Sequence, residues 1–353
     1  TYGPRVINFN ISGTGPHTIL LNSYLPQITK DVIIDGTSQP GYTGENPVIT
    51  IDGQNLIAWC FNAYRLNGLE ISGFDFNGFI KNGITLSGCH NVIIKSNNIA
   101  LKNSNYSIQT KMHFARIAVY SCENISFYNN TLNTTFENIP TPGPYNYGII
   151  LTNTTNCNIG STEQDFSNKI VDCYNAVYLD SSQNIRISAN EIYDNVNGIL
   201  LEYGSNNSKE KPMILSYEEG IIRGVAEVGD IIEVFGGTGG ENANEFLGTV
   251  QANESGNWSL TATTSYDYLI ATATDQNNNT SMYSDEILVS PTCAKPTNLS
   301  ATEGISTSHT LTWDCPTGVT YNVAVGVKDL NPLDDNWIVS YNANITDNQI
   351  TIT

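Results

Sequence analysis

Three twelve-residue segments in the first part of the chain align without gaps: GCHNVIIKSNNI (88–99), SCENISFYNNTL (121–132) and SSQNIRISANEI (181–192). Each segment has Asn at its fourth position, a large apolar residue at its seventh, a second Asn at its tenth and Ile or Leu at its end. Less complete copies stand at 68–76 and 154–160. A repeat of this length constrains the fold strongly, because no copy can bury its apolar face alone and neighbouring copies must stack.

A short segment of alternating apolar residues precedes the copies, with the pairs Ile84/Leu86, Ile117/Val119, Ile149/Leu151, Val177/Leu179 and, without a full copy after it, Ile199/Leu201. The fourth-position residues 68, 91, 124, 156 and 184 are 23, 33, 32 and 28 residues apart. The shortest spacing fits one turn of a parallel β-helix, and the longer spacings indicate loops inserted into the same coil. The sequence therefore predicts an all-β fold with stacked coils around one continuous core.

The segment LPQITKDVIIDGTSQPGYTGENPVITIDG (25–53) carries the most specific resemblance to known proteins. It resembles the first coils of large exported bacterial β-helix proteins. Together with the repeats, it makes residues 1–207 similar to the right-handed parallel β-helices of bacterial surface proteins and polysaccharide-active enzymes. The resemblance implies an exported protein.

The pattern changes near residue 208. GIIRGVAEVGDIIEVFGG (220–237) and LIATATDQNNNTSMYSDEI (269–287) resemble a bacterial immunoglobulin-like domain, expected at 208–290 with Gly-Asp and Ser-Gly-Asn turns between its strands. After SPTCAKP (290–296), the chain resembles the first strands of a fibronectin type III domain, with Trp313 as its core residue. Residues 291–353 are too few for a sandwich of about 100 residues. We therefore expect this domain to be incomplete and the chain to be part of a longer protein.

The charge balance excludes several partners. The chain has 15 Lys+Arg against 34 Asp+Glu, a formal net charge of −19, and no basic tract. Nucleic acid is therefore not an expected partner. No apolar run is long enough to insert this segment into a membrane. The resemblance implies a secreted or cell-surface, outer-membrane-associated protein, exported by an outer-membrane secretion system through a C-terminal sorting domain beyond Thr353.

The adjacent pair Cys89-His90 suggests a nucleophile with its base, or half of a metal site. The repeats favour packing, because Cys89 aligns with Cys122, Thr154 and Ser182, and His90 aligns with Glu123 and Gln183. No catalytic residue is predicted. A disulfide and free thiols both remain open for Cys89 and Cys122, and the redox state of Cys157 and Cys173 is also open. Both Asn rows are expected to face inward and to satisfy turn backbone.

An enzyme is the main alternative to a non-catalytic protein. Asp172 and Asp194 occupy equivalent positions, so they could act as acid and base, bind Ca²⁺, or simply be solvated acids near a turn. The catalytic signatures of polysaccharide lyases and glycoside hydrolases are missing from the sequence. Carboxylates and a Lys or Arg that converge in one groove of the β-helix would favour the enzyme.

Two loops inserted at the same corner of consecutive coils, 100–116 and 133–148, are the predicted ligand site. Their aromatic rings can stack on sugars, or they can instead fold back onto the flank of the β-helix. The candidate ligand-binding residues are Tyr106, Lys111, His113, Phe114, Arg116, Phe136, Tyr145 and Tyr147.

Two further sites follow from the resemblance to β-sandwich modules. Asp275, Asn277 and Asn279 form an oxygen-rich turn that suits Ca²⁺, with an ion-free turn as the alternative. Cys293 and Cys315 flank the first fibronectin-like hairpin and are candidates for a disulfide. The expected function is adhesion or glycan binding without catalysis, with a glycan or another surface protein as partner. The alternatives are a polysaccharide lyase or glycoside hydrolase and a purely structural spacer.

Overall fold

The computed structural model describes residues 5–44, 46–102, 114–135, 145–163 and 166–289, together with five strands of the last 60 residues. The chain divides into two compact units, Thr1–Leu288 and Val289–Thr353. The domain boundary expected at residues 207 and 208 lies inside the first unit. No helix in the described part of the chain is long and apolar enough to cross a membrane.

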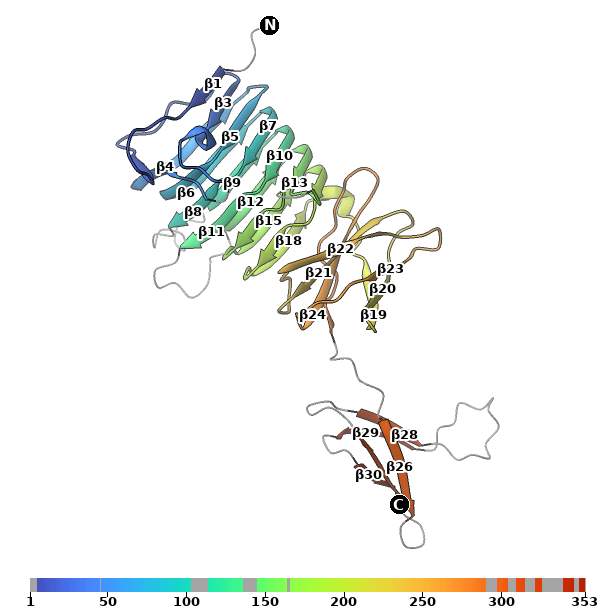
Figure 1. The fold of residues 1–353 in the computed structure, drawn as a ribbon. Coiled ribbons are helices and arrows are strands. Elements are labelled where there is room, and N and C mark those ends of the chain that lie inside the picture. The colour runs from blue at the N-terminus through green and yellow to red at the C-terminus, as the bar shows by residue number, and fades with distance from the viewer. Residues whose placement is uncertain are drawn as a thin grey trace. The chain divides into compact units, whose positions relative to one another are not determined.

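Residues up to Glu202 form a parallel β-helix with two long parallel sheets, whose strands are stacked in rows in Figure 1. The first sheet contains, in spatial order, β1 (Arg5–Asn8), β3 (Val32–Asp35), β5 (Leu69–Ser72), β7 (His90–Lys95), β10 (Glu123–Tyr128), β13 (Thr155–Ile159) and β16 (Gln183–Ile187). The second sheet contains β2 (His17–Leu20), β4 (Ile49–Tyr64), β6 (Phe74–Ser87), β8 (Asn98–Lys102), β9 (Phe114–Tyr120), β11 (Thr131–Thr135), β12 (Asn146–Thr152), β14 (Lys169–Val171), β15 (Asn175–Asp180), β17 (Glu191–Tyr193) and β18 (Asn197–Glu202). A 3₁₀ turn, η1 (Gly36–Ser38), follows β3, and a second, η2 (Ser205–Ser208), follows β18.

The register confirms the repeat alignment. Ile94 lies opposite Phe127, and Phe127 lies opposite Ile159, in neighbouring parallel strands of the first sheet. The alternating residues of the second sheet pair in the same way, with Ile117 opposite Ile149. These apolar residues are all fully buried, and they belong to one continuous core that runs along the stack. The predicted parallel β-helix is therefore confirmed.

One of the two Asn rows faces inward, as predicted. Asn97, Asn130, Asn168 and Asn190 are buried, and the Oδ1 of each of the last three accepts from the backbone N–H and the Nδ2 of the preceding row member. The Nδ2 of each row member also donates to a backbone carbonyl, for example from Asn130 to Ile94 at 2.8 Å. This inner ladder satisfies backbone groups that the strands leave unpaired at the corner of each coil.

The prediction that the other Asn row faces inward is wrong. Asn91, Asn124 and Asn156 are exposed, and Asn184 is half-buried. All four have a left-handed backbone, with φ between 52° and 60°. The left-handed residue interrupts the two-residue alternation of the strand, so that two successive residues face outward at 90–91 and at 123–124.

The cysteine row is a packing feature, as predicted from the repeats. The backbone N–H of Cys89 donates to Cys122 Sγ, that of Cys122 to Thr154 Oγ1, and that of Thr154 to Ser182 Oγ. Each thiol or hydroxyl in turn donates to the carbonyl two residues before it. Cys89, Cys122, Cys157 and Cys173 are all buried free thiols, so no disulfide joins the first pair. Burial raises the pKa of Cys157 to about 12.

After the last coil come two antiparallel sheets. One contains β19 (Met213–Glu218), β20 (Ile221–Val225) and β23 (Asn257–Thr261), and the other β22 (Glu245–Gln251), β21 (Ile231–Gly237), β24 (Tyr268–Thr274) and β25 (Ile287–Leu288). The second unit contains an antiparallel sheet of β26 (Thr297–Glu303), β27 (His309–Asp314) and β30 (Gln349–Ile352), and a pair formed by β28 (Tyr321–Val325) and β29 (Val339–Ile345).

Within the first unit, the antiparallel sheets are joined to the end of the β-helix. Thr280 N–H donates to the Ile185 carbonyl of β16, and Ile192 and Ala243 exchange two backbone hydrogen bonds. The carboxylate of Glu233, which is buried, accepts from Ser188 Oγ and Ala189 N–H. Tyr283 belongs to the same core as the coils. Backbone pairing and side-chain packing therefore both close this end of the stack.

Candidate functional site

A cluster of tyrosines lies on the outer side of the second sheet, next to the two predicted ligand loops. Ala115, Ala118 and Ile150 are buried there beneath rings of Tyr120, Tyr145, Tyr147 and Tyr178. We refer to these seven residues as the tyrosine patch. Its strands β9, β12 and β15 are neighbours in the second sheet, and the small side chains of the two alanines leave room for the rings above them.

The rings of the tyrosine patch pack on one another. The ring centroids of Tyr147 and Tyr178 are 5.1 Å apart, with an angle of 60° between the ring planes. Burial, followed by the neighbouring hydroxyls of Tyr178, Tyr145 and Tyr120, raises the pKa of Tyr147 to about 12. Tyr147 is nearly buried, whereas Tyr120, Tyr145 and Tyr178 are half-buried. The patch therefore presents partly accessible, uncharged phenol rings at neutral pH.

The predicted ligand residues have different positions. Tyr145 and Tyr147 belong to the tyrosine patch, and Phe114 is half-buried at the start of β9. Tyr106, Lys111, His113 and Phe136 lie outside the described residues. Two members of the patch, Tyr120 and Tyr178, were not predicted. Their positions on the outward side of strands with alternating apolar residues could have indicated them.

Arg116 is not on the surface. It is fully buried in β9, in register between Gly83 and Gly148 of the neighbouring strands. Its Nε donates to the Asn133 carbonyl, and its Nη1 donates to Asn146 Oδ1 and to the Tyr147 carbonyl at 3.0 Å. Burial lowers the pKa of this guanidinium. Its contacts in the described part of the chain tie together the strands from which the two loops leave.

The residues of the predicted calcium site form a hydrogen-bonded turn. Asp275 Oδ1 accepts from the N–H groups of Asn277 and Asn279, and Asp275 Oδ2 accepts from Asn279 Nδ2 at 2.9 Å. The Oδ1 of Asn279 accepts from Asn184 N–H of the last coil. Among the described residues, no three His, Cys, Asp or Glu side chains are grouped to hold a metal ion. Calcium binding here stays a prediction, and Cys293 and Cys315 lie outside the described residues.

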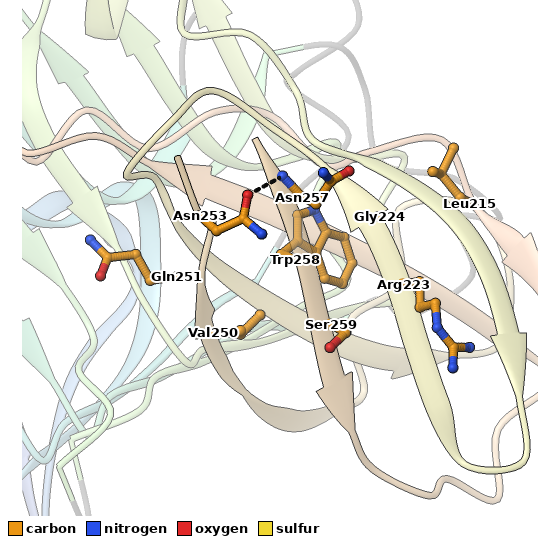
Figure 2. A pocket seen from close by; sticks show the side chains of 9 residues that line it. All are labelled: Leu215, Arg223, Gly224, Val250, Gln251, Asn253, Asn257, Trp258 and Ser259. Carbon is orange, nitrogen blue, oxygen red and sulfur yellow. Dashed lines mark hydrogen bonds between the residues drawn. The ribbon is translucent and has the colours of Figure 1, made fainter. Parts of the chain in front are cut away.

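A cavity of about 540 Å³ opens on the antiparallel sheets after the β-helix (Figure 2). Its lining includes Trp258, with Arg223, Gln251 and Asn257 among the polar residues. Gly224 is required next to the indole, because a Cβ there would lie 2.2 Å from Trp258 Cζ2. The sequence did not point to this cavity, since its residues come from four strands and a turn. Trp258 itself is only 4% exposed, which limits it as a stacking surface.

Asp172 and Asp194, the two acids at equivalent positions of the repeats, both have a left-handed backbone at the same corner of consecutive coils. Burial, followed by the nearby charge of Asp194, raises the pKa of Asp172, while buried Arg116 opposes the shift. A carboxyl with a raised pKa is suited to donate a proton. Asp172 therefore remains a candidate proton donor, with Asp194 as its neighbour.

The fold and its strand register define the chain as a parallel β-helix protein with antiparallel sheets attached to its last coil. No sequence model of a protein family matches it, and no curated protein sequence matches it. Full-length tailspike protein 2 from Escherichia coli O157:H7 bacteriophage CAB120 is similar at 9% identity and a TM-score of 0.31, over 73% of this chain and 49% of that one. The enzymatically active domain of tailspike protein 2 from bacteriophage CBA120 is similar at 9% identity and a TM-score of 0.26, over 74% of this chain and 57% of that one.

This chain therefore spans about half the length of the two tailspike structures. TM-scores this low do not establish a shared architecture. The assignment to the parallel β-helix class is based on the strand pairing of the chain itself.

Proposed function

We propose that this chain is part of a secreted or cell-surface protein that binds glycans without changing them. The observation that carries the proposal is the tyrosine patch, in which phenol rings gather on a rigid parallel sheet at the base of two inserted loops. A rigid scaffold with long loops is a common arrangement for binding sites.

Sugar rings expose both C–H faces and hydroxyl groups, and tyrosine matches both. Its ring stacks on the apolar face, while its hydroxyl donates and accepts hydrogen bonds. The half-buried rings of Tyr120 and Tyr178 are held by their neighbours, so little side-chain entropy remains to be lost when a ligand binds.

The test is binding of the 353-residue chain to a glycan array, followed by titration of the best glycan. Tyr178→Ala is expected to weaken binding about tenfold, because an aromatic contact of this kind contributes about 1.4 kcal/mol. Tyr217→Ala is the matched control, because Tyr217 is also half-buried but lies in β19 of the antiparallel sheets, outside the β-helix. Equal affinity of the Tyr178→Ala variant and the unchanged chain would contradict the assignment to this patch.

A glycoside hydrolase or polysaccharide lyase is the second candidate, favoured by the raised pKa of Asp172 beside Asp194. Release of reducing ends or unsaturated sugars from a polysaccharide panel, abolished by Asp172→Asn, would establish it. If no product forms from any bound glycan, the non-catalytic function is supported.

The proposal also covers the domain organisation of the chain. We assign the antiparallel sheets at 208–290 to an immunoglobulin-like domain and those at 291–353 to an incomplete fibronectin type III-like domain. They would space the β-helix from the cell, in a longer chain exported by an outer-membrane secretion system. A purely structural spacer would instead show no ligand on the array.

A further inference from the structure

We propose that the exposed Asn row is a second binding surface, for a linear uncharged polysaccharide chain lying parallel to the axis of the β-helix. The row consists of Asn91, Asn124, Asn156 and the half-buried Asn184, and it is extended by Asn67, which precedes the register-equivalent Gly68. We call these five residues the outer amide row. The inference rests on the proposed glycan-binding function, but it concerns a different surface from the tyrosine patch.

The side chains of the outer amide row are linked into two hydrogen-bonded groups, Asn67–Asn91–Asn124 and Asn156–Asn184. Asn91 Nδ2 donates to Asn67 Oδ1 at 2.6 Å, Asn124 Nδ2 donates to Asn91 Oδ1, and Asn184 Nδ2 donates to Asn156 Oδ1 at 3.1 Å. Asn156 Nδ2 instead donates to the Glu123 carboxylate at 3.1 Å. Each amide is therefore oriented before any ligand arrives, which reduces the entropy lost on binding.

The backbone does not require these amides. The inner ladder donates to backbone carbonyls at every step, whereas within the described residues the amide groups of the outer row form hydrogen bonds with side chains only. The left-handed backbone of Asn91, Asn124, Asn156 and Asn184 could also be supplied by glycine, which adopts positive φ without strain. The left-handed backbone therefore does not by itself account for the row of amide groups on the surface.

The amides keep hydrogen-bonding capacity toward solvent. A primary amide has two N–H donors and two acceptor lone pairs, and one bond to each neighbour uses one donor and one lone pair. At Asn91, which bonds on both sides, one donor and one lone pair remain. A donor beside an acceptor is the combination that recognises two adjacent hydroxyls of a sugar.

The surroundings favour an uncharged ligand. Asn67, Asn91, Asn124 and Asn156 line a shallow groove of about 350 Å³ together with His90 and Glu123. The only two ionisable groups of this lining face each other, with His90 Nδ1 3.4 Å from Glu123 Oε2. On the same sheet, Lys95 is paired with Glu70 at 2.9 Å. An anionic polymer would find no unpaired cation in the groove.

The spacing favours a polymer over a small ligand. Neighbouring coils place successive amides about 4.8 Å apart, which is close to the length of one sugar unit in an extended chain. The four register-equivalent positions from Asn91 to Asn184 therefore span about 14 Å, and Asn67 extends the row by one side chain. Affinity should rise with oligosaccharide length until the row is covered, and then stay constant.

The experiment uses the 353-residue chain in affinity electrophoresis with hydroxyethyl cellulose, dextran, yeast mannan and laminarin, and with the anionic polymer alginate. Oligosaccharides of two to eight units of the best polymer are then titrated by calorimetry. The test variant is Asn91→Gly/Asn124→Gly, which retains positive φ but removes two amides. The matched control is Asn129→Gly, an exposed Asn with φ 52° outside the groove.

Binding of at least one neutral polymer, weakened tenfold or more by the double variant and unchanged by Asn129→Gly, is the expected result. The inference is overturned if the double variant binds every polymer as well as the control does, or if alginate alone binds. Loss of binding in Tyr178→Ala but not in the double variant would support the tyrosine patch and overturn this inference. The reverse pattern would support the outer amide row and contradict the assignment to the patch. If no glycan binds at all, both are overturned.

Discussion

The inner ladder provides the sharpest test of what holds the coils together. In the unchanged chain, Asn130 Oδ1 accepts from the backbone N–H and the Nδ2 of Asn97, both at 3.2 Å, and Asn130 Nδ2 donates to the Ile94 carbonyl at 2.8 Å. Asn130→Ala would leave the Asn97 N–H and the Ile94 carbonyl buried without these partners. At about 1–3 kcal/mol for each such group, we expect a loss of about 3–4 kcal/mol in the free energy of unfolding.

The measurement is urea unfolding followed by tryptophan fluorescence, comparing midpoints at unchanged slope. Asn124→Ala is the control, because Asn124 belongs to the outer amide row and its loss leaves no buried group unsatisfied. Its φ of 60° is unfavourable for alanine, so a loss of about 1–2 kcal/mol is expected there. If Asn130→Ala costs no more than Asn124→Ala, the stabilising role of the inner ladder is refuted.

Three other substitutions test separate features. Cys122→Ser should change the free energy of unfolding by less than about 1 kcal/mol, because Thr154 makes the same bonds with a hydroxyl; a larger loss in urea unfolding would contradict this. Gly224→Ala should lower the melting temperature by several degrees through the Cβ clash with Trp258, and an unchanged melting temperature would show that the contact relaxes freely. Burial raises the pKa of Glu233 above its ordinary value of 4.5, so its contribution to stability is fully present below about pH 4.5 and is lost as pH rises through the folded pKa. Glu233→Gln should therefore flatten the fall in melting temperature that begins above about pH 4.5, and an unaltered profile would exclude Glu233 as its source.

The sequence predicted the coils because their periodicity is repeated. Ile94, Phe127 and Ile159 recur at equivalent positions, and the structure stacks them in register. The same reasoning identified Cys89 as one member of a packing row. Residues that align in the repeats occupy the same position in successive coils. The alignment alone therefore predicts which side chains stack on one another.

The outward orientation of the outer amide row could not be predicted from the alternation of apolar and polar residues alone. A left-handed residue at 91 turns both His90 and Asn91 outward, and only the backbone angles reveal this. Arg116 was misleading for a related reason. The sequence places it in an expected exposed loop, yet it lies in β9, in register with glycines of both neighbouring strands, and its long side chain is buried. The cavity beside Trp258 depends on strands that meet only in the folded sheets.

The antiparallel sheets that cover the last coil also affect whether copies of the protein can associate. A stack of parallel coils that ended at β16 and β17 would offer free N–H and carbonyl groups, on which another chain could continue the sheets as a fibril grows. Thr280 and Ala243 already occupy hydrogen-bonding positions on this edge. The antiparallel sheets therefore act at this end as a stop against polymerisation, and severing them after residue 207 would turn a terminated stack into a template for aggregation.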